Sequence, residues 1–265
     1  MLIDLHVHTS RYSSCGRSEP EEMVAQARTL GLRALVFTEH AVHWPQQELE
    51  ELQARFPQVR LYCGAEITSA EGDDFLVYGL HDRTALDSGM AAADIIAITH
   101  RQHGAVILAH PYRYRDEVPE AVRTLGVDAI EIMSTNIYNY AHQRAAALAQ
   151  ELQIKAVAAS DGHHTDMLGL YATEIDALPA DNFALAELIR NGHTQIWLDA
   201  ETIRAQNEAL ERVRPEIEGF IAQGLSNRDL RELLSTYVNL TVIQGIRDGR
   251  DVMRPLQCVP ETVSP

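Results

Sequence analysis

Short apolar segments rich in β-branched residues alternate with longer segments of helical period over the first 200 residues of the chain. The short segments predict strands, and the segments with apolar residues three or four positions apart predict helices. The predicted strands are residues 2–7, 33–38, 59–67, 74–80, 105–110, 128–133, 154–160 and 194–198. The predicted helices are residues 21–31, 46–56, 91–104, 117–125, 140–152 and 182–192. This alternation is typical of a βα-repeating α/β fold with a parallel sheet.

Local signals mark both ends of the first predicted helix. Ser18 and Glu21 have the spacing of a capping box, and Pro20 suits the first helical turn. Gly31 suits the position that follows the last turn.

The chain beyond residue 200 has a different pattern. Residues 201–222 and 227–247 carry apolar positions of helical period, and they predict two amphipathic helices. Ser226 and Asp229 mark the start of the second helix. We expect the chain to divide into residues 1–200 and a helical C-terminal extension of residues 201–265. This extension would pack on the first unit or mediate homo-oligomerisation.

Charge and cysteine content narrow the class of protein. The 38 acidic residues outnumber the 22 basic ones, and the formal net charge of −16 would repel duplex nucleic acid. The chain lacks a run of about 18 apolar residues, and His6 interrupts any signal-peptide pattern, so neither a membrane span nor secretion is expected. Cys15, Cys63 and Cys258 lack the spacing of a disulfide framework. We therefore expect a cytoplasmic protein without disulfide bonds.

Histidine and carboxylate side chains occur where the predicted strands end. The chain has 12 histidines, several of them near carboxylates, and both groups are ligands of zinc, manganese and iron. In a closed parallel barrel the carboxyl ends of all strands share one rim, so the side chains that follow them converge. The residues at these positions are His6, His8, His40, Glu66, His110, Asp161 and His163. We expect a two-metal hydrolytic centre in which Glu66 is a bridging carboxylate.

Several neighbouring residues allow two interpretations. Glu39 is expected to orient His40 by accepting a hydrogen bond from its other ring nitrogen. Cys15 is a soft metal ligand or a loop thiol, and Asp74 is a ligand or part of a solvated turn. The histidines away from the strand ends are expected at the surface: His81, His100, His103, His142 and His193.

Arginines near the rim are candidates for binding a phosphate group, because a guanidinium matches two phosphoryl oxygens. Arg113 and Arg115 follow His110, while Arg11 and Arg17 lie in an earlier loop. For each arginine alone, a solvated surface position is the simpler interpretation. We expect at least one of them to bind the substrate.

The segments DLHVHT, TEH, GAEIT, AHPYR and ASDGH occur in that order, and with them the chain resembles the PHP family, named for polymerase and histidinol phosphatase domains. The similarity extends from residue 1 to about residue 200. The stretches GVDAIEIMSTN and ASDGHHTDMLGLYATEI are similar to the small stand-alone bacterial members, rather than to those embedded in polymerases.

The resemblance implies a distorted (β/α)7 barrel, similar to a TIM barrel, with two or three divalent ions (zinc, manganese or iron) and phosphoesterase activity. By position, His6, His8, Glu66 and Asp161 would hold one ion, Glu66 and His110 a second, and His40 with His163 a third. The chain departs from the family pattern in having SSCG where an aspartate is common, Glu39 for the aspartate of TDH, and Asp74 for a further histidine. The third site therefore depends on whether Cys15 replaces the missing aspartate.

The chemistry expected of such a site is attack of a metal-activated hydroxide on phosphorus. Arg113 would neutralise phosphoryl charge, and His40 or His163 would protonate the leaving group if no third ion is bound. The expected substrate is a small phosphate ester or nucleotide, with no duplex nucleic acid and no membrane as partner. Two alternatives stay open: an amide or lactone hydrolase with the same metal centre, and a non-catalytic regulatory protein with a vestigial site.

Overall fold

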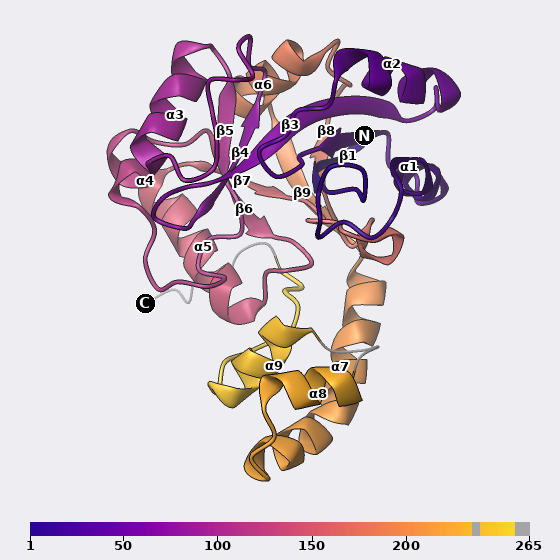
Figure 1. Ribbon diagram of the computed structural model, residues 1–265, viewed down its shortest axis with the longest axis vertical. Helices are drawn as coiled ribbons and strands as arrows, with labels where there is room; N and C mark the ends of the chain where they lie inside the picture. The colour runs from indigo at the N-terminus through magenta and orange to yellow at the C-terminus, as the bar shows by residue number, and fades with distance from the viewer. Residues whose placement is uncertain (235–238, 258–265) are drawn as a thin grey trace.

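The computed structural model describes residues 1–234 and 239–257, and Figure 1 shows an α/β body joined to a smaller group of helices. The strands are β1 Leu2–Val7, β2 Ala34–Phe37, β3 Arg60–Thr68, β4 Asp74–Tyr78, β5 Ala105–Leu108, β6 Ala129–Met133, β7 Lys155–Ala158, β8 Tyr171–Ile175 and β9 Thr194–Leu198. The helices of the body are α1 Pro20–Thr29, α2 Gln46–Arg55, α3 Ala92–Arg101, α4 Glu120–Thr124, α5 Asn139–Leu152 and α6 Asn182–Asn191, with a 3₁₀ turn at Thr165–Met167. The smaller group contains α7 Ala200–Ala222, α8 Asn227–Leu233 and α9 Leu240–Arg247.

All the described strands belong to one sheet that curves into a nearly closed barrel, in the order β7-β6-β5-β4-β3-β2-β1-β8-β9. The predicted α/β barrel is confirmed, but its strands are not all parallel. Strand β4 runs antiparallel to β3 and β5, and β8 runs antiparallel to β1 and β9. Only residues 69–73 separate β3 from β4, too few for the crossover that parallel strands need. Strand β8 is absent from the sequence prediction.

The barrel closes where β1 meets the chain that follows β7. The N–H of His8 donates to the backbone oxygen of Gly162 (2.9 Å), and the N–H of Gly162 donates to the oxygen of His6 (3.2 Å). Further along this seam the hydroxyl of Thr173 in β8 accepts from the N–H of Ala158 (3.3 Å) and donates to its oxygen (2.7 Å). The closure places the end of β1 beside the residues that follow β7.

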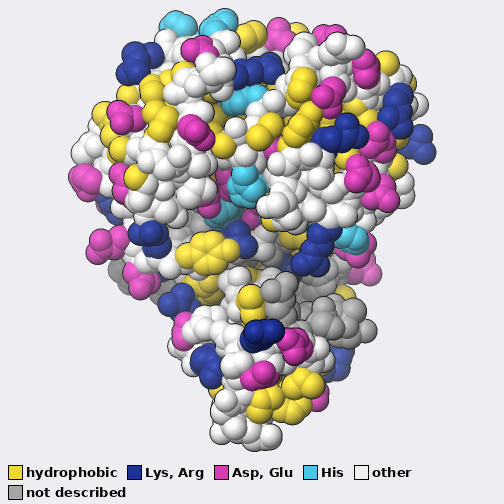
Figure 2. Space-filling model, viewed as in Figure 1, with side chains coloured by type: hydrophobic (Ala, Val, Ile, Leu, Met, Phe, Trp, Pro, Cys, Tyr) yellow, Lys and Arg dark blue, Asp and Glu magenta, His cyan; other side chains and the backbone are white. Residues whose placement is uncertain are grey.

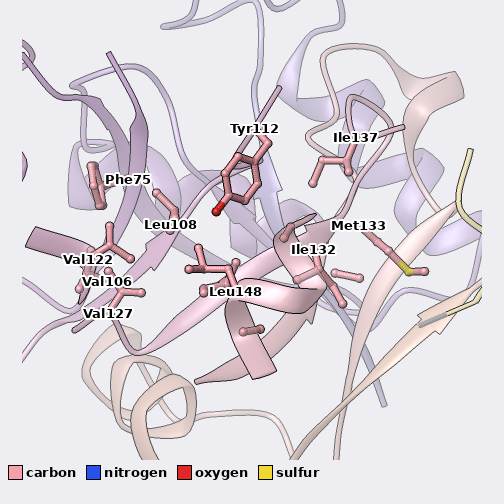
Figure 3. Packing of buried hydrophobic residues seen from close by; sticks show 14 of the residues in the cluster. Phe75, Val106, Leu108, Tyr112, Val122, Val127, Ile132, Met133, Ile137 and Leu148 are labelled. Carbon is pink, nitrogen blue, oxygen red and sulfur yellow. The ribbon is translucent and has the colours of Figure 1, made fainter. Parts of the chain in front are cut away.

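Apolar side chains fill the barrel and cover its outer face. Inside, Ile3 and Leu5 of β1 pack with inward residues of the other strands, and Leu185 of α6 belongs to the same cluster. Outside, α3, α4 and α5 cover β5 and β6, and Figure 3 shows Leu108, Ile132 and their neighbours in this layer. Because α6 packs at the amino-terminal end of the parallel strands, the carboxyl end remains the open mouth of the barrel.

Helices α7, α8 and α9 form an appendage that extends from the barrel (Figure 1). Its apolar residues, among them Ile217 and Ile243, pack around Tyr138 of the barrel. The predicted single helix over 227–247 is wrong: α8 ends at Leu233, and the side chain of Asn239 starts α9 by accepting from the N–H of Val242 (2.9 Å). Residues 235–238 lie outside the described part. Homo-oligomerisation through the appendage stays a prediction.

The start of α1 differs from the predicted capping box. The carboxylate of Glu22 accepts from the N–H of Glu19 at 2.9 Å, whereas the hydroxyl of Ser18 accepts from the N–H of Thr165 in another loop at 3.3 Å. Pro20 is the first helical residue, as predicted. Among the described helices, none is long and apolar enough to cross a membrane.

The seam between β7 and β8 yields a test of the barrel. Replacing Thr173→Val keeps the side-chain shape but leaves the backbone N–H and C=O of Ala158 without their partner, so we expect the free energy of unfolding to fall by about 1–3 kcal/mol. Urea denaturation followed by tryptophan fluorescence measures this loss. Thr173→Ser retains the hydroxyl and should lose less. Equal stability of the valine variant and the wild type would contradict the role of this bridge.

Candidate metal centre

All seven predicted ligands lie together at the open mouth of the barrel. Five of them are buried, whereas His40 is exposed and His163 is half-buried. A backbone bridge joins His40 to Glu66, just as one joins Val7 to Gly162 on the other side of β1. Figure 2 shows histidine side chains at the centre of this face of the barrel, above the appendage.

Glu66 is at the centre of the cluster. Its Oε1 lies 3.1 Å from Nε2 of His110 and 3.4 Å from Nε2 of His6. Its Oε2 lies 3.2 Å from Nε2 of His8 and 3.1 Å from Nδ1 of His40. One carboxylate therefore faces four imidazoles, and each oxygen is shared by two of them. This arrangement suits a carboxylate that bridges two cations.

Asp161 is the second buried carboxylate. Its Oδ1 lies 3.4 Å from Nε2 of His6 and 3.5 Å from Nε2 of His8. Its Oδ2 accepts hydrogen bonds from Nδ2 of Asn136 (2.7 Å) and from Nη1 of Arg113 (3.3 Å). One oxygen thus faces the imidazoles, while the other is fixed by neutral and cationic donors.

Two of the predicted ligands have a strained backbone. The φ angles of His110 (27°) and Asp161 (49°) are positive, a region that residues with a β-carbon rarely occupy. The N–H of His110 donates to Oε2 of Glu131 at 3.0 Å, which helps to hold this conformation. Such strain costs about 1–3 kcal/mol per residue and persists where the surrounding structure fixes it, often at functional sites. Ala41, His103, Tyr112 and Gln153 also have positive φ angles, so the strain supports a functional role of His110 and Asp161 only together with their place in the cluster.

Four groups of side chains bring ligand atoms within 4.8 Å of one another: His8, Cys15, His40 and His163; His6, His110 and Asp161; His6, His8 and Glu66; and Glu66, Asp74 and His110. The first group includes Cys15, whose Sγ lies 3.2 Å from Nε2 of His40. Asp74 reaches the last group because β4 is antiparallel and begins at the mouth. Cys15 and Cys63 are free thiols, and Cys258 lies outside the described residues.

Hydrogen bonds fix three of the imidazoles, and in His6 and His8 they leave Nε2 facing the carboxylates. They run from Nδ1 of His6 to Oε1 of Glu131 (3.1 Å), from Nδ1 of His8 to Oγ of Ser13 (3.2 Å), and from Nδ1 of His163 to the backbone oxygen of Asp161 (2.9 Å). A histidine that donates from one ring nitrogen presents a lone pair on the other, the form that binds a metal ion. The donor set, its spacing and these tautomers fit divalent metal ions.

The buried carboxylates make the site favour positive charge. Burial opposes protonation of His6, but Asp161, Glu131 and Glu66 outweigh it and raise its pKa well above the ordinary value. Burial also opposes protonation of His8, yet its bonds to Asp161 and Glu66 raise its pKa to about 9. The same histidines hold the pKa values of Glu66 and Asp161 well below their usual range against the effect of burial. Protons and metal ions would therefore compete for the same imidazole nitrogens and carboxylate oxygens.

His40 and His163 differ from the inner histidines. Burial lowers the pKa of His40, and it lowers the pKa of His163 to about 4 despite the nearby Asp161 carboxylate. Both rings are therefore neutral near pH 7. A neutral ring can bind a metal ion, whereas it has no spare proton for a leaving group.

Glu39 does not orient His40 as predicted. Its carboxylate accepts hydrogen bonds from Thr9, Ser13 and Trp44, including one of 2.5 Å from Oγ of Ser13. Ser13 in turn accepts from Nδ1 of His8, so Glu39 acts on His8 instead. The reason is alternation along the extended chain: Glu39 is fully buried in the body while the ring of His40 lies at the mouth.

Sequence reasoning missed three residues that hold ligands in place: Ser13, Glu131 and Asn136. Glu131 carries a detectable signal, because a carboxylate inside the apolar strand AIEIM needs buried partners. Ser13 and Asn136 lie in loops and carry none. His142, predicted at the surface, is 4% exposed and donates from Nδ1 to the backbone oxygen of Ile132 at 2.9 Å.

Arg113 is the predicted arginine that reaches the cluster. Its side chain is 15% exposed and bonds to Asp161, and its buried Nε has no hydrogen-bond partner among the described residues. Arg11 instead pairs with Glu48 at 3.4 Å, and its guanidinium lies over the ring of Trp44. The unmatched donor of Arg113 makes it the arginine best placed to receive an anion at this mouth.

Comparison with known proteins places the chain among proteins of this architecture. A model of the PHP domain matches residues 4–245. PsfC from Pseudomonas syringae is 23% identical, with a TM-score of 0.57 over 77% of this chain and 93% of its own. A candidate metal-dependent phosphoesterase from Bifidobacterium adolescentis is 17% identical (TM-score 0.52, 71% and 96% covered).

A lesion-specific endonuclease, EndoQ from Pyrococcus furiosus, is 14% identical, with a TM-score of 0.56 over 74% of this chain and 57% of its own. At these identities the likeness concerns the fold. No curated protein sequence is similar enough to the chain to count as a relative.

Glu131 offers a test of the metal centre. The carboxylate of Glu131 accepts one hydrogen bond from Nδ1 of His6 and one from the backbone N–H of His110. In Glu131→Gln, the amide NH₂ group must face one of these two donors, so one of the bonds is lost. We expect the affinity for Mn²⁺ or Zn²⁺ to fall about 10- to 100-fold. Competition with a chelating dye measures this affinity. Glu174→Gln removes an exposed carboxylate from β8 and serves as the matched control, and equal affinities of the two variants would refute the role of Glu131.

Proposed function

The chain belongs to the PHP domain family, and from this premise we propose that it is a metal-dependent phosphoesterase that hydrolyses a small phosphate ester or nucleotide. The observation that carries the proposal is the position of Arg113. A nearly buried guanidinium with an unmatched N–H lies against the seven predicted ligands, which are five imidazoles and two carboxylates. Such a cation beside a metal centre suits an anionic phosphoryl group more than a neutral amide or lactone.

The residues have distinct roles in this proposal. His6, His8, Glu66, His110 and Asp161 would hold two divalent ions, with Glu66 between them. Divalent ions in such a site neutralise phosphoryl charge and lower the pKa of water. Arg113 would bind a phosphoryl oxygen through Nε and its second amino group while Asp161 keeps its orientation.

His40 and His163 complete the proposal as ligands of a third ion together with Cys15. Their lowered pKa values favour this role over that of a general acid, because both rings are already neutral near pH 7. Cys15 supports it by its position, since its thiol is grouped with these two rings and His8. Burial and nearby carboxylates raise the pKa of this thiol to about 11, so a bound cation would have to displace its proton.

The proposal that the substrate is small rests on the net charge of the protein. A net charge of −16 disfavours a long polyanion. A protein of the same fold, EndoQ, is a lesion-specific endonuclease, so the fold itself does not decide the matter. We retain a small ester or nucleotide as the proposed substrate and include nucleic acids in its test.

Metal dependence and substrate class are tested together. Protein loaded with Mn²⁺ or Zn²⁺ should release phosphate from phosphomonoesters or nucleotides, a chelator should abolish the release, and the same ion should restore it. Asp161→Asn should lower kcat at least about 100-fold by weakening the site. Release of inorganic phosphate is measured for the phosphomonoesters and nucleotides, and cleavage of oligonucleotides is followed on gels. Cleavage of duplex DNA alone, or no release from any ester at full metal occupancy, would refute the proposal.

Arg113 provides a narrower test. Arg113→Ala should lower kcat/KM for a phosphate ester about 100-fold, because it removes a preorganised donor for the phosphoryl group. Arg11→Ala is the matched control, since Arg11 pairs with Glu48 away from the ligand cluster, and its kcat/KM should change less than about twofold. Steady-state kinetics at saturating metal measures both. A loss shared equally by the two variants would point to a general effect of charge.

A further inference from the structure

A cleft of about 510 Å³ lies between the barrel mouth and the appendage. Arg113, Tyr114 and Tyr140 line it on the barrel side, and residues of the appendage and the turn after it line the other. Arg113 and Tyr114 also line a crevice beside Asp74 and His110. The cleft and this crevice share Arg113 and Tyr114, so Arg113 lies between the cleft and the proposed metal centre. Its volume falls in the range of small-molecule sites.

The wall formed by the appendage is fixed to the barrel. The N–H groups of Asn139 and Tyr140 donate to the backbone oxygens of Met253 (2.9 Å) and Asp251 (3.2 Å). The hydroxyl of Tyr140 donates to the backbone oxygen of Arg113 at 3.1 Å. Tyr140 therefore links the chain after α9 to the arginine at the metal centre, so the cleft has two connected walls.

Exposed aromatic and apolar side chains line the cleft together with polar ones. Tyr114 is 66% exposed, and Arg113 lies over its ring with 4.7 Å between Cζ and the ring centroid. Leu240 of α9 lines the opposite wall and is 42% exposed. Large exposed apolar groups on two walls of one cleft leave room for an apolar surface of a ligand.

The polar groups of the appendage wall mostly bond to one another. Nδ2 of Asn227 donates to Oε1 of Gln244 (2.7 Å), and Nε2 of Gln244 donates to Oδ1 of Asp248 (2.7 Å). The Oδ1 of Asn227 accepts from Nε of Arg247 (3.1 Å). These bonds occupy part of the polar surface of this wall. The exposed ring of Tyr114 on the other wall offers a flat face on which an aromatic ring can stack.

We propose that the cleft between Tyr114 and α9 binds the organic part of the substrate, and that this part carries a flat aromatic ring which stacks on Tyr114. The phosphoryl group would then lie at Arg113, and the appendage would form the second wall of the site. This inference rests on the proposed phosphoesterase function and adds the class of leaving group to it. The appendage is accordingly a determinant of specificity.

The matched pair of AMP and ribose 5-phosphate tests the proposal, because both esters have the same scissile bond and differ in the aromatic base. Stacking of one base contributes about 1–3 kcal/mol, so wild-type kcat/KM should be about 5- to 150-fold higher for AMP. Tyr114→Ala should reduce this AMP to ribose 5-phosphate ratio about tenfold. Thr241→Trp, which fills the cleft from α9, should reduce it similarly. The ratio cancels any general loss of activity.

Leu233→Ala is the control on the appendage, because Leu233 is 61% exposed on α8 and does not line the cleft. It should leave the ratio unchanged, and circular dichroism should confirm that each variant is folded. A wild-type ratio near one, or equal loss for both esters in the Tyr114 and Thr241 variants, would overturn the cleft assignment while the phosphoesterase proposal stands.

If neither ester is hydrolysed, the proposed function fails on its own, and isothermal titration still tests the cleft. Tighter binding of AMP than of ribose 5-phosphate, lost in Tyr114→Ala, would support the aromatic site. Equal or undetectable binding of both by the wild type would refute it.

Discussion

Two carboxylates buried at the mouth of an apolar barrel are the constraint on which the rest of this site depends. Glu66 and Asp161 are 2% and 1% exposed, and a buried charge is costly unless it is paired. In the structure, imidazoles, one guanidinium and one amide surround the two carboxylates and pair with them. The raised pKa values of His6 and His8 result from the same interaction with these carboxylates. A site of this kind holds positive charge whether protons or metal ions provide it.

The barrel seam makes this pairing possible. Asp161 follows the last parallel strand, whereas His6 and His8 belong to the first, so only closure brings them together. The bonds between β1 and Gly162 form this closure at the mouth, directly beside the charged cluster. These backbone bonds therefore support both the stability of the barrel and the geometry of the site. Asp161, whose φ angle is positive, lies directly beside them. Loss of the seam would separate carboxylate and imidazoles at once.

The appendage reaches the same cluster through one loop of the barrel. The segment between β6 and α5 carries Asn136, which bonds to Asp161, and Tyr138, which packs in the apolar cluster of the appendage. Arg254 donates to the backbone oxygen of Thr135 in this loop. The appendage thus supports a metal-site carboxylate in addition to forming a wall of the cleft. The PHP domain match, which runs through α7 and α8 into α9, accords with this continuity.

The sequence by itself determined the alternation of strands and helices, and it predicted the set of candidate ligands that the structure brings together. Both follow from local patterns: apolar periodicity marks the strands, and the candidate ligands lie near the ends of these strands or directly after them. The short loop between β3 and β4 already implies that these two strands are antiparallel. Only the tertiary structure decided the position and direction of β8, the coupling of Glu39 to His8 through Ser13, and the role of Glu131. Direction depends on which strand edge is free for pairing, and side-chain partners lie far apart in the sequence, 125 positions for His6 and Glu131. Such contacts leave no periodic trace in the chain, because they form only when the barrel closes.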